Sequence, residues 1–267
     1  MIRFSIVTIT YQAAKVLPHT LESVWRQTYP QVEHIIVDGA STDGTVALAQ
    51  AYEARHRETD TRHEVVVRSE PDRGLYDAMN KGLRLAGGDY IIFLNAGDTF
   101  PTGQTLEQVA GSVGEGEELP AVLYGDTDIV DGEYRFLRHR HFSAPEQLTW
   151  RSFRKGMLVC HQAFYARADI ARALPYNLDY RFSADVDWCI RVMKEAEKHH
   201  LPLRNVHAVV AEYLEEGQTT QNHWASLKER YRVMCDHYGS VRTFWMHLWL
   251  VLRMLKRRCL TFLKICF

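Results

Sequence analysis

The sequence has no paired cysteines, no long apolar run and no excess of charge of either sign. The five cysteines are Cys160, Cys189, Cys235, Cys259 and Cys266. Because they are scattered without a CxxC pair, they favour reduced thiols in a cytosolic protein over a disulfide framework or a zinc site. The 32 basic residues nearly balance the 33 acidic ones, which argues against a nucleic-acid partner bound through bulk charge.

No stretch reaches the roughly 18 uncharged apolar residues that a membrane-spanning helix needs. Met1 leads almost directly into an apolar run, so we expect no signal peptide and a cytoplasmic location. A chain of 267 residues can bury a full core, either as one large domain or as two fused halves. The sequence contains no internal repeat and no low-complexity tract, and nothing in it indicates an oligomeric state.

Three short apolar runs, at residues 4–10, 34–37 and 90–94, each end at small or acidic residues. β-Branched and aromatic residues dominate these runs, as they do in buried parallel strands. In an open parallel sheet, ligands bind at the carboxyl ends of the strands. Carboxylates at two such ends suit a ribose or base at one and a metal-bound diphosphate at the other.

Alternating strand and helix patterns predict an α/β fold with a mostly parallel central sheet flanked by helices. Further strands are expected at 64–69 and 121–124, an exposed strand or loop at 134–142, and helices after residue 17, from residue 45, at 75–85 and at 185–200. We expect the boundary between two halves of the chain at the Gly- and Glu-rich segment 111–120. It separates a half spanning 1–110 from a half spanning 111–239 and a tail spanning 240–267.

Four runs of the first half stand out together. They read IVTITY (6–11), VDGASTDGT (37–45), SEPDRGLYDAMNKG (69–82) and FLNAGD (93–98). In this order they resemble family 2 glycosyltransferases with the GT-A fold. The second pair is similar to the subgroup that includes the colanic acid biosynthesis glycosyltransferase E and related capsule and O-antigen enzymes. The resemblance returns at CHQA (160–163), SADVD (183–187) and EGQTT (216–220), and it fades after about residue 231.

The resemblance implies that the loops after the first two strands bind a nucleotide-sugar donor. The residues concerned are Thr10, Tyr11, Asp38, Ser41 and Asp43. Carboxylates accept hydrogen bonds from base and ribose groups, and glycines beside them let the backbone approach closely. An ordinary Asp-Gly turn followed by a helix cap explains the same residues without a ligand.

Three more donor-binding candidates surround the start of the helix at 75–85. The guanidinium of Arg73 suits a base or a diphosphate, although a surface turn with Asp72 as helix cap is also compatible with this segment. Asp77 and Lys81 lie four residues apart on one helical face. They either bind the donor or form a simple surface pair.

Asn95, Ala96, Gly97 and Asp98 occupy the place of the family's DxD motif, and the resemblance assigns them to the donor site. In the family, a carboxylate here binds Mg²⁺ or Mn²⁺, which neutralises the departing diphosphate. Asn95 and Gly97 stand where acids are usual, so Asp98 is the expected anionic ligand. One carboxylate with phosphate oxygens and waters is compatible with Mg²⁺. His223 is a further candidate for contact with the metal or the diphosphate.

Asp185 and Asp187 stand at the start of an expected helix. An inverting transfer needs a carboxylate that takes the proton of the attacking acceptor hydroxyl. The family motif reads Glu-Asp, an aromatic residue and Asp, so the resemblance assigns the general base to Asp185. Favourable charge at a helix N-terminus is the alternative, and it explains Asp187 better than Asp185. Asp187 and His161 are expected to contact the acceptor or a sugar, although a hydrogen-bonded core histidine also explains His161.

The tail, residues 240–267, contains no acid and six Lys or Arg residues. On a helix, all of these except Arg258 fall within roughly 100° of one another, opposite aromatic and aliphatic residues. This pattern is typical of a helix lying on an anionic membrane surface. A helix packed on the domain, or a dimer contact, is the alternative.

These observations predict an inverting, metal-assisted glycosyltransferase that uses a nucleotide-diphosphate sugar, with a UDP-sugar favoured. The resemblance implies a lipid-linked saccharide acceptor at the inner face of the cell membrane, in bacterial surface polysaccharide assembly. A nucleotidyltransferase of sugar phosphates is one alternative, but it would need a glycine-rich loop after the first strand, and residues 10–13 contain no glycine. An inactive membrane-bound scaffold is the other, and the presence of Asp98 and Asp185 argues against it.

Overall fold

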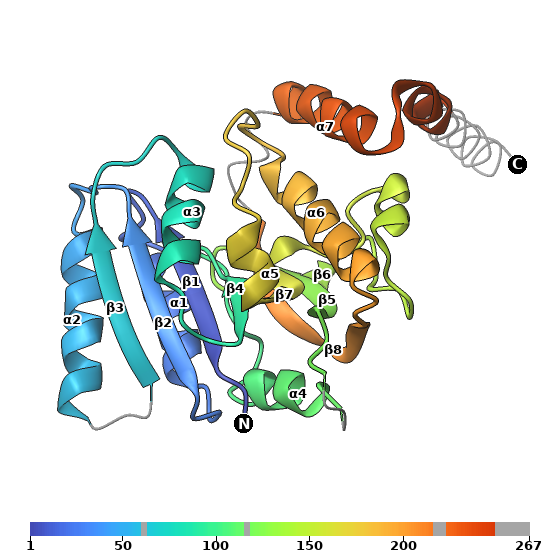
Figure 1. The fold of residues 1–267 in the computed structure, drawn as a ribbon. Coiled ribbons are helices and arrows are strands. Elements are labelled where there is room, and N and C mark those ends of the chain that lie inside the picture. The colour runs from blue at the N-terminus through green and yellow to red at the C-terminus, as the bar shows by residue number, and fades with distance from the viewer. Residues whose placement is uncertain (60–62, 115–117, 216–222, 249–267) are drawn as a thin grey trace, which may run out of the picture.

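The computed structural model describes residues 1–59, 63–114, 118–215 and 223–248 (Figure 1). Within them, one eight-stranded sheet has the strand order β3-β2-β1-β4-β7-β5-β6, with β8 beside β5. The strands are β1 (Phe4–Thr10), β2 (Val32–Asp38), β3 (His63–Ser69), β4 (Tyr90–Phe93), β5 (Val122–Val130), β6 (Phe136–His139), β7 (Phe164–Arg167) and β8 (Leu203–Leu214). The α/β class predicted from the sequence is therefore confirmed.

The sheet is parallel in its first half and mixed as a whole. β3, β2, β1 and β4 pair in parallel, whereas β7 is antiparallel to both β4 and β5. β6 is also antiparallel to β5, and β8 is parallel to it. The prediction of a mostly parallel sheet therefore holds for the half formed by β3, β2, β1 and β4.

Helices cover both faces of the parallel half. The helices and short 3-10 turns are α1 (Leu17–Trp25), α2 (Thr45–Glu58), α3 (Leu75–Leu85), α4 (Thr105–Gly111), η1 (Trp150–Lys155), η2 (His161–Ala163), α5 (Ala168–Ala173), α6 (Ala184–Lys198) and α7 (His223–Tyr238). α1 and α2 form one small core with Ile36 of β2. α3 packs closely on β1, because a Cβ atom at Gly82 would lie 2.3 Å from Cγ1 of Val7. With both faces covered, every residue of β1 and β2 is buried.

β5 extends beyond the predicted end at residue 124. The polar residues after Tyr124 end the apolar run in the sequence. They stay in the sheet because β8 pairs with them, with a register shift between Tyr124 and Asp126. β6 is exposed along its whole length, as predicted for the basic segment 134–142.

α6 and α7 lie together at one end of the molecule (Figure 1). α6 buries Trp188 completely, which fixes the helix on the core. After Gly239, which has a φ of 85°, residues 240–248 continue as a helix. Thr243 of this helix is fully buried and its hydroxyl donates to the carbonyl of Met234, 3.0 Å away.

Candidate functional site

The carboxyl ends of the first three strands lie side by side. Thr10 of β1 is the register partner of Asp38 of β2, and Asp38 is the partner of Ser69 of β3. The Asp38 carboxylate is fully buried and accepts hydrogen bonds from the hydroxyl and the backbone N–H of Ser41, and from the Ser69 hydroxyl at 2.8 Å. Asp38 therefore organises the loop that follows β2, and its contact with a nucleoside stays a prediction.

The loops after β1 and β2 are bound to each other. The backbone N–H of Gln12 donates to Oγ of Ser41 at 2.8 Å, and the N–H of Ala14 donates to Asp43 at 3.1 Å. Gln12 and Ala40 have φ values of 49° and 62°, a left-handed conformation that is strained for non-glycine residues. Strain of this kind persists where surrounding contacts enforce it, so these two loops have a fixed shape.

Asp43 binds the first residue of α2, although the N-cap of this helix is Gly44 and no side chain caps it. Its carboxylate accepts hydrogen bonds from the backbone N–H and the hydroxyl of Thr45, and the hydroxyl lowers the pKa of Asp43. Tyr11 is 62% exposed beside Gly39, where a Cβ atom would lie 3.2 Å from the Tyr11 ring. The Tyr11 ring thus forms an exposed flat surface at the strand ends, against a backbone that approaches closely.

A cavity of about 780 Å³ lies between α3, η2, α6 and α7, and the loop after β3 contributes Arg73 to its lining. Four residues that the sequence predicted line it: Arg73, Asp77, His161 and Asp185. Residues that the sequence analysis did not single out include Tyr76, Arg140, Gln162, Tyr213 and Arg230. The cavity therefore joins the loop after β3 to the start of α6, 110 residues later in the chain.

The ion pairs around α3 differ from the simple pair considered between Asp77 and Lys81. Arg73 contacts Asp77 at 3.4 Å, and Lys81 instead contacts Glu70 at 2.8 Å. Asp72 does not cap α3, because the N-cap is Gly74, whose N–H donates to Asp72 at 2.8 Å. The Arg73 side chain is 78% exposed at the cavity, so its guanidinium remains accessible to an anion.

Asp185 is held through both of its carboxylate oxygens. The hydroxyl of Tyr76 donates to Oδ1 at 3.1 Å, and Nδ1 of His161 lies 3.4 Å from Oδ2. Burial alone would raise the pKa of Asp185, but His161 and Arg230 outweigh burial and hold it below its usual value. Burial and the nearby Asp185 raise the pKa of Tyr76, so its hydroxyl keeps its proton. Asp185 is therefore an anionic carboxylate in the cavity at neutral pH.

The segment after β4 contacts the same histidine. Nδ2 of Asn95 donates to Nε2 of His161 at 3.2 Å, which leaves Nδ1 of that ring to carry the proton facing Asp185. Asp98 is 6% exposed and accepts a hydrogen bond from Nε2 of Gln162 at 3.0 Å. Burial raises the pKa of Asp98 to about 6. Asn95 thus contacts the histidine that contacts Asp185, and Asp98 contacts the adjacent Gln162.

The donor atoms after β4 suit a hard divalent cation. Oδ1 of Asn95 is buried without a hydrogen-bond partner among the described residues, and Asp98 adds a desolvated carboxylate. Oxygen ligands of this kind suit Mg²⁺ or Mn²⁺, with phosphate oxygens and waters completing the shell. Within the described ranges, no group of three or more His, Cys, Asp or Glu side chains is placed to hold a metal. His223 begins α7, and its side chain lies outside the described residues.

Asp187 lies two residues beyond Asp185, and both of its carboxylate oxygens are used inside the protein. Nε2 of His237 lies 2.8 Å from Oδ1, and Nε of Arg191 donates to Oδ2 at 2.7 Å. Asp187 is 5% exposed and is absent from the lining of the cavity. In this structure it joins α6 to α7.

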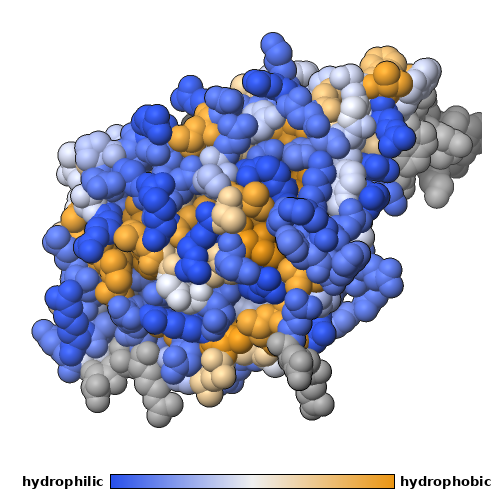
Figure 2. Space-filling view, in the orientation of Figure 1, coloured by the Kyte–Doolittle hydropathy of each residue, from blue (hydrophilic) through white to orange (hydrophobic). Residues whose placement is uncertain are grey.

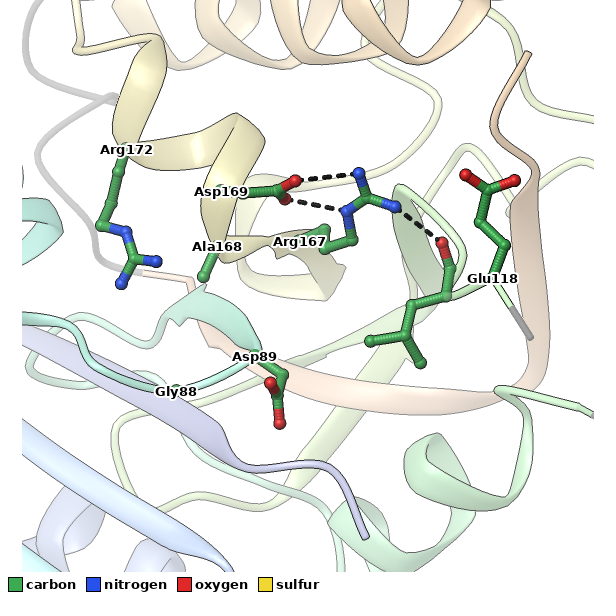
Figure 3. A pocket seen from close by; sticks show the side chains of 8 residues that line it. Gly88, Asp89, Glu118, Arg167, Ala168, Asp169 and Arg172 are labelled. Carbon is green, nitrogen blue, oxygen red and sulfur yellow. Dashed lines mark hydrogen bonds and ion pairs between the residues drawn. The ribbon is translucent and has the colours of Figure 1, made fainter. Parts of the chain in front are cut away.

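A second cavity, of about 470 Å³, lies at the opposite ends of the strands, beside Gly88 and Asp89 (Figure 3). Figure 3 shows the Arg167 guanidinium turned toward Asp169, with which it forms two hydrogen bonds. Arg167 also donates to the carbonyl of Leu119. Because it is remote from the carboxyl ends of β1, β2 and β3, this cavity is not the predicted site.

Apolar side chains are exposed along α7 and the helix that follows it. Trp224 is 83% exposed, and Val241, Phe244 and Trp245 are 72%, 53% and 63% exposed. Figure 2 shows apolar side chains at the surface in this part of the molecule. None of the helices within the described ranges combines the length and apolarity needed to cross a bilayer. The tail beyond residue 248 lies outside the described residues.

Comparisons with known proteins identify relatives of this chain. It is 37% identical over 215 residues to a PGL/p-HBAD biosynthesis glycosyltransferase of Mycobacterium bovis, covering 80% of this chain and 77% of the relative. It is 37% identical over 105 residues to a putative teichuronic acid biosynthesis glycosyltransferase, TuaG, of Bacillus subtilis, covering 39% of this chain and 40% of TuaG.

Solved structures share the fold at low sequence identity. The crystal structure of S. aureus TarS 1–349 in complex with UDP-GlcNAc matches with a TM-score of 0.67 and 18% identity, covering 87% of this chain and 64% of that chain. The mannosyltransferase PcManGT from Pyrobaculum calidifontis, in complex with GDP-Man and Mn²⁺, matches with a TM-score of 0.58 and 18% identity, covering 90% and 64%. The fold is thus GT-A-like, with a mixed sheet flanked by helices. A family model of glycosyl transferase family 2 matches residues 5–173, and the chain belongs to this family.

Proposed function

We propose that this protein is an inverting glycosyltransferase that transfers a sugar from a UDP-sugar to a lipid-linked or saccharide acceptor in bacterial surface polysaccharide biosynthesis. The observation that carries the proposal is the Asp185 carboxylate, held anionic between Tyr76 and His161 in a cavity beside the strand ends. Membership of glycosyl transferase family 2 supports transfer chemistry and argues against a nucleotidyltransferase. The finer assignment to capsule, exopolysaccharide or O-antigen synthesis follows the resemblance to the colanic acid subgroup.

In the proposed reaction, the acceptor hydroxyl attacks the anomeric carbon of the donor sugar. The bond between that carbon and the diphosphate oxygen breaks, and the nucleoside diphosphate leaves with the bonding electron pair. Asp185 accepts the proton of the attacking hydroxyl. Its low pKa keeps it deprotonated before the reaction, and its two hydrogen bonds fix the direction in which it accepts the proton.

The donor is proposed to occupy the space between the strand ends and the cavity. The loops containing Tyr11, Asp38 and Asp43 would hold the nucleoside, and Arg73 would pair with an anionic oxygen of the diphosphate. Asn95 and Asp98 would hold Mg²⁺ or Mn²⁺. When bound, this ion supplies positive charge to the departing diphosphate. The Mn²⁺ complex of PcManGT and the UDP-GlcNAc complex of TarS support these choices of cofactor and donor.

We propose further that the protein works at the inner face of the cell membrane. One side of helix 240–248 packs on the domain through Thr243, while Phe244 and Trp245 remain exposed. The sequence beyond residue 248 adds basic and apolar residues at helical spacing. A surface of this kind suits an enzyme whose acceptor is anchored in a lipid bilayer.

Thermal unfolding with a panel of nucleotide sugars and nucleoside triphosphates tests the proposal. A ligand present at about 100 times its Kd stabilises the folded state by about 2.7 kcal/mol. We expect a UDP-sugar with Mg²⁺ to raise Tm more than UTP does, and we expect release of UDP from that sugar. Stabilisation by UTP and a sugar phosphate, with no effect of any UDP-sugar, would instead favour a nucleotidyltransferase. An absence of both binding and turnover would favour a scaffold.

A further inference from the structure

The backbone before α6 is bound by a single carboxylate from α7. Glu229 accepts hydrogen bonds from three consecutive backbone N–H groups, those of Arg181 at 2.8 Å, Phe182 at 2.6 Å and Ser183 at 2.7 Å. Hydrogen bonds to an ionised acceptor are roughly twice as strong as neutral ones. The carboxylate also lies at the N-terminus of α6, where negative charge is favourable. Residues 181–183 are therefore held by a contact that spans 46 to 48 residues of sequence.

α6 begins without a side-chain cap of its own. The N-cap residue of α6 is Ser183, a type that normally caps with its own side chain, yet its hydroxyl makes no capping hydrogen bond. The Ser183 hydroxyl turns toward α7 and donates to the carbonyl of Ser226 at 3.5 Å. Ser183 is fully buried and stands two residues before Asp185. The start of α6 is thus fixed by α7 rather than by its own first turn.

α7 also holds the chain two residues beyond Asp185. His237, in the last turn of α7, contacts Asp187 at 2.8 Å, and Nζ of Lys194 contacts the other nitrogen of the same ring at 2.9 Å. Asp185 therefore lies between two residues that α7 binds. Arg230, adjacent to Glu229 in sequence, lines the same cavity as Asp185.

We propose that Glu229 is a positioning residue for glycosyl transfer, because its hydrogen bonds to residues 181–183 set the direction of the Asp185 carboxylate in the cavity. The inference rests on the proposed function, in which Asp185 is the general base. Glu229 is absent from the residues that line the cavity, so its effect on the reaction must pass through the residues it binds, 181–183.

Hydrogen exchange of the full-length protein tests the contact without any substrate. Glu229→Ala removes both carboxylate oxygens and with them all three hydrogen bonds, whereas Glu229→Gln keeps one oxygen. The matched control is Tyr238→Phe, which removes a hydrogen bond from the other end of α7 to the carbonyl of Trp150. We expect exchange of the amides of 181–183 to rise at least about tenfold in Glu229→Ala, less in Glu229→Gln, and not in Tyr238→Phe. Unchanged exchange in both Glu229 variants would overturn the proposal.

Measurements of kcat and KM then distinguish a positioning role of Glu229 from a purely structural one. With the UDP-sugar that the thermal panel identifies, we expect Glu229→Ala to lower kcat about 10- to 100-fold, with KM for the donor nearly unchanged. Glu229→Gln should recover part of kcat, and Tyr238→Phe should keep it. In an Asp185→Asn background, Glu229→Ala should have little further effect, because both changes act on one group.

Two results would contradict the positioning role. The first is an unchanged kcat in Glu229→Ala although the amides of 181–183 exchange faster. The second is that Glu229→Ala lowers kcat by the same factor in the wild-type and in the Asp185→Asn background. If the wild type turns over no nucleotide sugar, the proposed function fails and the positioning role fails with it. Faster exchange in Glu229→Ala would still establish the contact between α7 and α6 in that case.

Discussion

Replacing Asp185 with asparagine isolates proton transfer from folding and donor binding. Asparagine has the same size, but its single amide oxygen cannot accept the proton of an attacking hydroxyl. It can also accept a hydrogen bond from Tyr76 or from His161, but not from both. The loss of a general base typically costs about 10²- to 10⁴-fold in rate, or about 3–5 kcal/mol on the barrier.

The stability of Asp185→Asn should change much less than its activity. One hydrogen bond is lost, at about 1 kcal/mol, and the cost of burying a charged carboxylate is removed at the same time. We therefore expect Tm within a few degrees of the wild type, donor binding retained in the thermal assay, and kcat for UDP release reduced by at least about 100-fold.

Asp187→Asn is the matched control, because the same change is made two residues away. It breaks the contacts of Asp187 with His237 and Arg191, so we expect a destabilisation of about 1–3 kcal/mol. For a chain of this size that lowers Tm by roughly 2–10 °C. kcat measured below the transition should fall by less than about tenfold. A folded Asp187→Asn variant that loses more kcat than Asp185→Asn would refute the assignment of the base.

Three further predictions concern the metal, pH and the membrane. Excess EDTA should abolish turnover, and Asp98→Asn should reduce it more than Asn95→Ala; full turnover in EDTA would exclude the metal. The pKa of Asp98 is raised to about 6 in the folded state, so the folded state binds this proton more tightly than the unfolded chain does. The contribution of Asp98 to the free energy of unfolding is therefore lost as pH rises from about 4 to about 6. Metal-free Asp98→Asn should therefore have a higher Tm than the wild type at pH 8 but not at pH 4, and equal Tm differences at both pH values would contradict this. A chain ending at Leu248 retains the buried Thr243; it should stay folded and bind the donor, but sediment less with anionic liposomes than the full chain. Equal sedimentation of the two chains would remove residues 249–267 from the proposed membrane contact.

The strand ends were predictable because their signal is local. β1, β2 and β4 are short apolar runs in the sequence, and parallel pairing brings their carboxyl ends to one edge. The helix periodicity of α3 and α6 was equally local, and both helices lie within two residues of their predicted bounds. By contrast, β8 carries no clean alternation because most of its residues are only partly buried, and it was missed.

The partners of the candidate base were not predictable, because long-range contacts create them. Tyr76 appears in the sequence as an apolar position of α3, and only the fold brings its hydroxyl to Asp185, 109 residues away. Glu229 is one of two acids in a largely polar helix, and no pattern marks it as the group that binds the backbone before α6. The same limit applies to Asp77 and Lys81, whose spacing suggested that they pair with each other. In the structure Asp77 pairs with Arg73, and Lys81 pairs with Glu70.

The stereochemistry of the product tests the central claim most directly. Proton NMR of the first sugar product, taken before it can equilibrate, reports whether the configuration at the anomeric carbon differs from that of the UDP-sugar donor. A single displacement with Asp185 as base predicts an inverted product in the wild type, and formation of that product at least about 100-fold more slowly in Asp185→Asn. A product that retains the donor configuration, or one that forms at the wild-type rate in Asp185→Asn, would contradict this account.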